Sequence, residues 1–208
     1  MPPSPHSAVD PALPDSSSPT ASGFKEWSLV CAALGAGAQS LILRKGGIHE
    51  GRGGFWWRHD RFFLFPTHFH EQDGQFPWTP PADMAETVAE PADGFHTVRF
   101  LATVDFKHQI TSRETAARLR PFHFWTEETV RARFDYSEET GISLAFLRIH
   151  RLASPWTFPD QRHFGGCRSW LDLPAPPEDI RWTPVVDDST HEGRRAAVRE
   201  ILGISGPF

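Results

Sequence analysis

The stretch His96–Ile110, HTVRFLATVDFKHQI, decides the fold because apolar side chains recur in it at every second position. The alternating apolar residues, which would share one face of an extended chain, are Val98, Phe100, Ala102, Val104 and Phe106. A period of two sustained over this length predicts a β-strand with one buried face. The core of the domain is therefore expected to be a sheet, and the flanking segments supply its other strands.

Further segments on both sides of this stretch also predict strands. They are short runs rich in Leu, Ile and Phe, bounded by Gly, Pro or polar residues. These segments are SLILRK (40–45), RFFLFPT (61–67), ISLAFLRIHRL (142–152) and CRSWLDL (167–173). In the third of them, Arg148 falls on the opposite face from Leu147 and Ile149, so one side of that strand is polar.

Helices are predicted where the apolar period changes to three or four residues. FKEWSLVCAALGAGAQ (24–39) carries such a stripe, and its glycines predict the end of the helix. Thr111 with Glu114 predicts a capping box for SRETAARLR, and Thr126 predicts the cap of WTEETVRARFDY. The C-terminal helix is expected over residues 191–203, with Val198, Ile201 and Leu202 facing inward.

The order of these elements predicts the fold class. Residues 1–22 are rich in Pro, Ser and Ala without an apolar period, which predicts a disordered tail. Residues 23–208 are expected to form a single α+β domain, because strands come in groups and do not alternate singly with helices. The prediction is a small curled mixed or antiparallel sheet, or a barrel, flanked by helices.

Composition and charge narrow the classes of function. The formal net charge is −5 over 208 residues, which argues against indiscriminate binding of nucleic acid. The charge is nevertheless uneven, since residues 41–70 carry five basic against two acidic side chains and residues 99–168 carry eleven against eight. These two positive blocks would form one basic face or remain ordinary solvated arginines. No apolar run is long enough for a membrane span and no signal peptide is visible, so the cytoplasm is the expected location.

Several stretches resemble the DUF 1802 family of bacterial proteins. They are FKEWSLVCAAL, LILRKGGI, FFLFPTHFHEQ, HFWTEETVRARFDY, LAFLRIHRL and FGGCRSW, which together span Phe24 to Leu173. The family is defined without a function, and the resemblance implies an occasional association with restriction-endonuclease-like domains. The order of elements is also similar to PUA-like or ASCH-type barrels, which implies binding of RNA or of modified nucleotides.

The segment THFHEQ (67–72) is the first candidate site. His68 and His70 would point the same way on a strand, and with Glu71 they could bind a divalent metal if His123, His150 or His163 completed the set. The spacing fixes no third ligand, however, and the same residues are equally suited to cap a helix or to hydrogen-bond a ligand. The metal site is therefore an alternative, and no cofactor is predicted.

The segment LRKGGI (43–48) is the second candidate. Arg44 can hold a phosphate through two hydrogen bonds and Lys45 adds a point charge, while Gly46 and Gly47 allow the backbone to approach an anion closely. The alternative is a polar hairpin turn in which the glycines serve the backbone alone. Nearby, Trp56 and Trp57 lie among polar residues, where one would stack on a base or cover the end of the barrel.

The segment FGGCRSW (164–170) is the third candidate. Cys167 lacks a base at a recognised spacing, so we expect it, like Cys31, to be a small core residue and Arg168 to point to the opposite face.

The combined prediction is a concave basic face that recognises a nucleic acid or nucleotide, and a modified base is one target that would suit it. It would present Arg44, Lys45, His68, His70, Arg148 and Arg168, flanked by Trp56 or Trp57. Such a domain would serve as an accessory of a restriction, defence or regulatory system. Two alternatives stay open at this point: a metal-dependent hydrolase or nuclease centred on His68, His70 and Glu71, and a scaffold for a protein partner.

Overall fold

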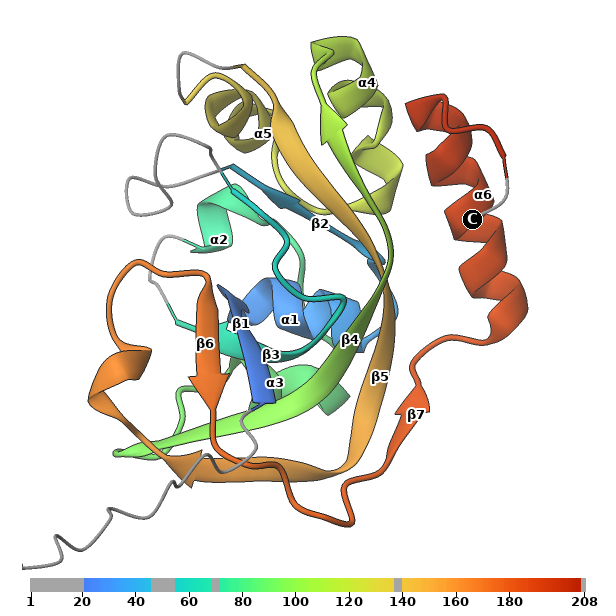
Figure 1. Ribbon diagram of the computed structural model, residues 1–208. Helices are drawn as coiled ribbons and strands as arrows, with labels where there is room; N and C mark the ends of the chain where they lie inside the picture. Colours follow the sequence, from blue (N-terminus) through green and yellow to red (C-terminus); the bar gives the residue numbers. More distant parts are fainter. Residues whose placement is uncertain (1–20, 46–54, 69–71, 137–139, 207–208) are drawn as a thin grey trace, which may run out of the picture.

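A curled mixed sheet forms the centre of the molecule in the computed structural model (Figure 1). The structure describes residues 21–45, 55–68, 72–136 and 140–206. Within these residues seven strands form one sheet, in the order β2-β5-β4-β3-β1-β6, with β7 paired to β5. The strands are β1 (Ala21–Trp27), β2 (Leu41–Arg44), β3 (Arg61–Thr67), β4 (Phe95–Ile110), β5 (Ile142–Pro159), β6 (Trp170–Leu173) and β7 (Trp182–Pro184).

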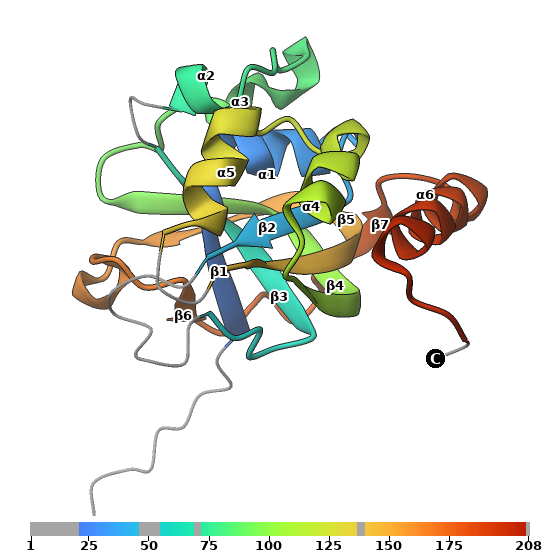
Figure 2. The same ribbon diagram turned by 90° about the horizontal axis from the view of Figure 1, so that it is seen from above.

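The helices differ in how they contact the sheet. Seen from above, α1, α3 and α5 lie on one side of the sheet, whereas α6 lies apart beside β5 and β7 (Figure 2). The helices are α1 (Ser28–Gly35), α2 (Gln72–Gln75), α3 (Ala85–Val88), α4 (Arg113–Arg118), α5 (Glu127–Phe134) and α6 (Asp188–Leu202), with short 3₁₀ turns at Ala82–Met84, Arg120–Phe122 and Arg162–Phe164.

The strand pairing combines antiparallel and parallel neighbours. The long strands β4 and β5 pair antiparallel over most of their length, and β3 pairs antiparallel with β4. β1 pairs parallel with β3, so that Trp27 lies opposite Thr67, and antiparallel with β6. This pairing confirms the predicted α+β class with a curled mixed sheet.

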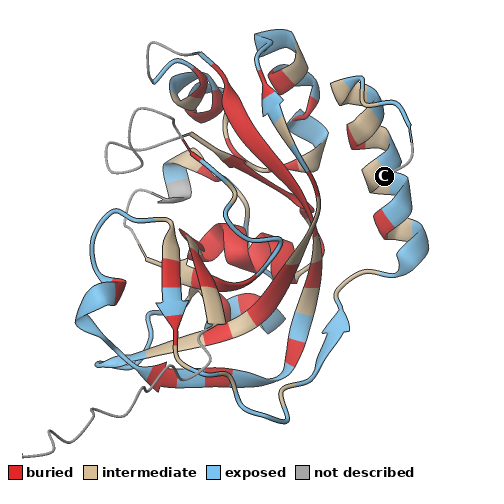
Figure 3. Ribbon diagram, viewed as in Figure 1, coloured by how far each residue is buried: buried red, intermediate tan, exposed pale blue. Residues whose placement is uncertain are grey.

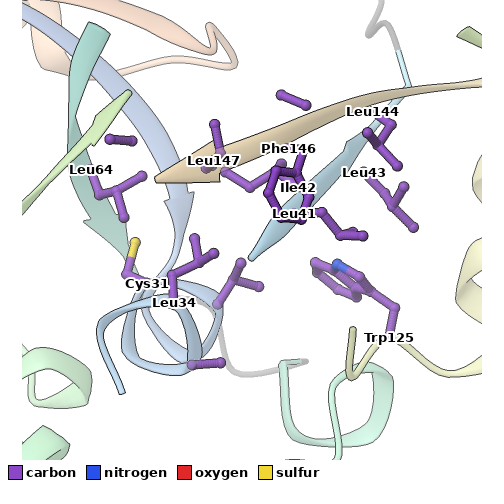
Figure 4. Close-up of a cluster of buried hydrophobic side chains, with 14 of the residues drawn as sticks. Cys31, Leu34, Leu41, Ile42, Leu43, Leu64, Trp125, Leu144, Phe146 and Leu147 are labelled. Carbon is purple, nitrogen blue, oxygen red and sulfur yellow. The ribbon is translucent and has the colours of Figure 1, made fainter. Parts of the chain in front are cut away.

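The core lies on both faces of the sheet. The larger cluster contains the apolar residues of α1 and β2 together with most of the first half of β5, and it includes Leu34, Ile42 and Phe146 (Figures 3 and 4). A second cluster lies where the beginning of β4 pairs with the end of β5, and it includes Phe63 and Trp156. β3 contributes alternate residues to the two clusters, which explains its continuous apolar run.

The apolar face predicted for the stretch His96–Ile110 is wrong at Val98, the first of its five residues. Pairing with β5 shifts register between Val98 and Phe100, and Val98 belongs to the second cluster with Leu101, whereas Phe100 and Ala102 belong to the larger one. The change of side coincides with this register shift, where two steps along β4, from Val98 to Phe100, lie opposite five steps along β5, from Trp156 to Arg151.

Local boundaries also differ from the predictions. β1 begins at Ala21, inside the predicted tail, and its last four residues, 24–27, belong to the segment that we expected to be helical. The cap of α4 is Ser112, whose side chain accepts a hydrogen bond from the Thr115 N–H, and not Thr111. The Thr126 cap of α5 is confirmed, and α6 begins at Asp188, three residues earlier than predicted, because Asp187 caps it.

Candidate functional site

The carboxyl ends of the parallel strands β1 and β3 lie side by side and lead into other elements of the fold. β1 ends at Trp27, where the buried helix α1 begins, and β3 ends at Thr67, whose hydroxyl donates to the Glu26 carbonyl at 3.1 Å. Charged side chains from several elements gather around this edge, and they form the candidate site.

A buried carboxylate lies at the centre of this edge. Glu26 is 1% exposed; its Oε1 accepts from the Trp27 N–H at 2.9 Å and its Oε2 lies 3.4 Å from Arg44 Nε. Arg44 also donates to the carbonyl of Lys25, and its guanidinium lies 4.8 Å from the centre of the Phe24 ring. The last residue of β2 thus joins β1 across the open side of the curled sheet.

Arg133 of α5 brings a second guanidinium to the same carboxylate. Its guanidinium carbon lies 3.6 Å from the centre of the Trp125 ring and 5.5 Å from that of Trp27. Burial, and to a smaller extent the charge of Arg44, lower the pKa of Arg133 to about 10, although the Glu26 carboxylate acts in the opposite direction. The two arginines are therefore close enough to repel each other while sharing one buried acid.

Lys25 and Arg168 extend this charge across β1 to the segment before β6. Lys25 Nζ donates to the Gly166 carbonyl at 3.0 Å. Burial and the nearby charge of Arg168 lower the pKa of Lys25, whereas the Cys167 thiol raises it. We call Lys25, Arg44, Arg133 and Arg168 the basic cluster. In the described part of the chain, Glu26 is the one carboxylate that forms an ion pair with any of the four.

An exposed tryptophan lies beside the cluster. Trp56 is 71% exposed, and its carbonyl accepts from Trp170 Nε1 at 3.1 Å, two residues beyond Arg168. Trp57 differs, because its ring stacks on Phe24 at 5.3 Å and its Nε1 donates to the Ser143 hydroxyl at 2.9 Å. Of the two predicted aromatics, Trp56 faces solvent and Trp57 packs against the core.

His68 lines a cavity of about 230 Å³ between α1, α3, β3 and β4, which we call the His68 cavity. Burial lowers the pKa of His68, while the Glu90 carboxylate and a hydrogen bond with the Ala89 backbone raise it, and His96 lowers it. The ring is therefore neutral at pH 7. His68 thus lies one residue beyond Thr67 but faces a different environment from the basic cluster.

The remaining predicted residues do not converge on one face. Lys45 Nζ donates to the carbonyls of Gly141 and Phe134 at the end of α5, at 2.9 and 3.4 Å. Arg148 forms an ion pair at 2.5 Å with Asp188 at the start of α6. Gly46, Gly47, His70 and Glu71 lie outside the described residues. Of the residues expected on one basic face, Lys45 and Arg148 are thus held by partners at α5 and α6.

Two expectations about metal and thiol chemistry can be compared with the structure. Over the ranges that the structure describes, no group of three or more His, Cys, Asp or Glu side chains could hold a metal ion. Cys167 is exposed, so its prediction as a core residue is wrong, whereas Cys31 is buried as predicted. Cys167 precedes β6 in a glycine-containing turn, where its side chain has no core to enter.

Sequence reasoning missed Lys25, Glu26 and Arg133 as members of the site. Glu26 could have been noticed as a charged residue between Phe24 and the apolar helix, where burial demands a partner. Its partners Arg44 and Arg133 are distant in sequence, and only the pairing of β2 with β5 and the packing of α5 bring them to it. A pattern within one segment could not reveal this convergence.

Comparison with known proteins identifies a family. The model of the family described as "Domain of unknown function (DUF1802)" matches residues 23–197. The crystal structure of ASCH from Zymomonas mobilis is similar at 14% identity with a TM-score of 0.42, covering 84% of this chain and 93% of that chain. A mutant of the same protein gives 13% identity, a TM-score of 0.42 and coverage of 84% and 94%. No curated protein matches this sequence.

Among the described helices, none has the length and apolar character that crossing a membrane requires.

Proposed function

The chain belongs to the DUF1802 family, and for this member of it we propose recognition of a nucleic acid or nucleotide, with phosphates bound at the basic cluster and a base stacked on Trp56. One observation carries the proposal: Arg44 and Arg133 share the single buried carboxylate of Glu26, and on the same strand Lys25 lies close enough to Arg168 for that charge to lower its pKa. The lowered pKa values of Lys25 and Arg133 indicate that both cations are partly desolvated and that each lies near another cation, Arg168 for Lys25 and Arg44 for Arg133.

Such an excess of positive charge is unfavourable unless an anion compensates it. Burial removes the solvation of each charge, and like charges at short range raise the free energy further. Glu26 offsets one of the four charges, so about three remain. Phosphate suits this arrangement, because guanidinium groups donate two parallel hydrogen bonds to its oxygens and a lysine adds a point charge.

The exposed Trp56 favours a nucleotide over a simple anion. A tryptophan that is 71% exposed beside Arg168 and Trp170 presents a flat ring to solvent at the edge of the cluster. Stacking of a base on such a ring contributes about 1–3 kcal/mol and tolerates different bases, including modified ones. The predicted accessory role in a restriction, defence or regulatory system requires recognition of this kind.

Fluorescence anisotropy with labelled single-stranded RNA and DNA of one sequence tests the proposal. Arg168→Glu is expected to weaken binding about tenfold, since it replaces an attraction to phosphate by a repulsion. Trp56→Ala is expected to weaken it by roughly tenfold through lost stacking. Arg181→Glu reverses an exposed charge in the segment before β7 and should leave the affinity unchanged.

Two results would contradict the proposal. The first is that neither oligonucleotide binds the wild-type protein. The second is that Arg181→Glu weakens binding as strongly as Arg168→Glu. The second result would mean that overall charge, and not the basic cluster, attracts the nucleic acid. If Arg168→Glu and Trp56→Ala weaken the binding of RNA but not that of DNA, RNA is the ligand of the basic cluster.

A further inference from the structure

The His68 cavity extends beyond the space between α1 and α3. It adjoins a second hollow of about 290 Å³, and the two share His68, Glu90, Pro91, Ala92 and His96. The apolar walls include Cys31, Leu64 and Phe100, which are at most 2% exposed. The combined space has an apolar inner end and a polar entrance formed by the chain between α3 and β4.

Some of the polar side chains around the entrance already have partners. Arg99 forms an ion pair with Glu86 at 2.8 Å, and His96 Nε2 contacts Asp160 Oδ1 at 2.7 Å. These two pairs account for the arginine and for one histidine of the lining, so neither is free to bind an added anion.

The carboxylates of Glu90 and Asp93 are different. Both side chains are exposed at the entrance, and neither forms an ion pair with a residue of the described ranges. Glu90 is close enough to His68 to affect its charge. The entrance therefore carries an excess of negative charge, in contrast to the basic cluster at the ends of β1 and β2.

His68 contributes a hydrogen-bond acceptor to the cavity, which favours a ligand that carries hydrogen-bond donors. His68 Nε2 is shielded from solvent and has no hydrogen-bond partner within the described part of the chain. Since the ring bonds to the Ala89 backbone, that bond comes from Nδ1, which leaves Nε2 with its lone pair. A shielded acceptor without a donor is unfavourable, and an N–H group would satisfy it.

We propose that the His68 cavity binds an organic cation, an alkylammonium or guanidinium group, through His68 Nε2 and the carboxylates of Glu90 and Asp93. Such a group only donates hydrogen bonds, and the unpaired polar atoms of the cavity only accept them. Its alkyl portion would lie against Leu64 and Phe100. The site shares no residue with the basic cluster, so it is independent of the proposed recognition of nucleic acid.

Isothermal titration calorimetry with butylguanidinium and with butylurea tests the proposal. The two molecules have nearly the same shape, but the urea carries no charge and offers a carbonyl where the guanidinium offers a donor. Butylguanidinium is expected to bind at least about tenfold more tightly than butylurea. The double variant Glu90→Gln/Asp93→Asn should reduce its affinity about tenfold, and His68→Phe about fivefold.

Control variants make the result specific. Glu178→Gln removes an exposed carboxylate outside the cavity and should leave binding unchanged, as should Arg168→Glu in the basic cluster. Equal affinity for butylurea, full affinity in the double variant, or no binding of butylguanidinium at millimolar concentration would each overturn the proposal. Spermidine and a short arginine-containing peptide, titrated in parallel, distinguish a free polyamine from a peptide side chain as the source of the cation.

Discussion

Glu26 is the residue on which the charges of the site depend. It is 1% exposed and lies 3.4 Å from Arg44, and its charge also raises the pKa of Arg133. A buried ion pair contributes little in itself, but removal of one partner leaves the other charge buried and uncompensated. The stability of this edge of the sheet and its capacity for anions should therefore change in opposite directions when Glu26 loses its charge.

Glu26→Gln is expected to lower the free energy of unfolding by about 3 kcal/mol, because Arg44 and Arg133 then lack a counter-charge. Added phosphate should stabilise this variant more than the wild type, since the anion replaces the lost carboxylate. Urea denaturation with and without phosphate measures both effects. Glu178→Gln, at an exposed position, is the control and should change stability by less than about 0.5 kcal/mol. A Glu26→Gln variant as stable as that control would show that the arginines do not depend on Glu26.

His123 should make the fold sensitive to acid. It is 3% exposed, neither ring nitrogen has a hydrogen-bond partner among the described residues, and burial together with the charges of Arg120 and Arg133 lowers its pKa from 6.5 to about 4. Above pH 6.5 the ring is neutral in both states, and full stability is present. As the pH falls from 6.5 to about 4, the unfolded chain binds a proton that the folded chain does not, which costs about 3 kcal/mol.

His123→Phe removes this proton and keeps an aromatic ring at the position. Between pH 6.5 and 4 the variant should lose about 3 kcal/mol less of its free energy of unfolding than the wild type loses. Chemical denaturation at a series of pH values measures the difference, with each protein referred to its own value at pH 7. Parallel curves for the two proteins would contradict the assignment.

At the scale of elements, the close contact between α1 and β4 leaves no room for a side chain at the end of the helix. Gly35 is the last residue of α1, and a Cβ placed there would lie 2.1 Å from Phe100 Cζ. Gly35→Ala should therefore destabilise the protein by about 2 kcal/mol, because a buried ring must move. The matched control is Gly193→Ala in α6, where nothing lies within 4 Å of the added carbon. That change should stabilise by about 0.5–1 kcal/mol. Thermal denaturation of both variants measures the contrast, and two shifts of the same sign would contradict the packing.

The elements also show what could be predicted from the sequence. β3, β4 and β5 were predicted because apolar residues in each follow a local pattern. β1 was not, since ASGFKEW has only a weak pattern and its strand character comes from pairing with β3 and β6. The register shift before Phe100 was missed for a similar reason, because it depends on the pairing with β5. Arg44 and His68 were predicted to share one face, whereas their separation into a basic cluster and an acidic cavity depends on partners from other elements.

For the molecule as a whole, the two sites have opposite charge although the chain has a net charge of −5. The basic cluster lies where β2 meets β1, and the His68 cavity lies between α3 and β4. α6 lies beside β5 and β7, apart from α1 and α3 (Figure 2). There Arg148 forms an ion pair with Asp188, and His191 Nε2 lies 2.6 Å from Asp105 Oδ2. An anionic polymer should therefore contact the molecule at the basic cluster while the acidic surfaces repel it, so that the binding has a defined orientation.

The dependence of oligonucleotide affinity on salt tests the central claim most directly. Three uncompensated charges in the basic cluster predict a slope of about −2 in a plot of log affinity against log salt for a single strand. In the double variant Lys25→Gln/Arg168→Gln, two charges are removed, so the magnitude of the slope should fall from about 2 to below about 1. A wild-type affinity that does not change with salt, or a slope that is the same in the double variant, would contradict the assignment of phosphate binding to these residues.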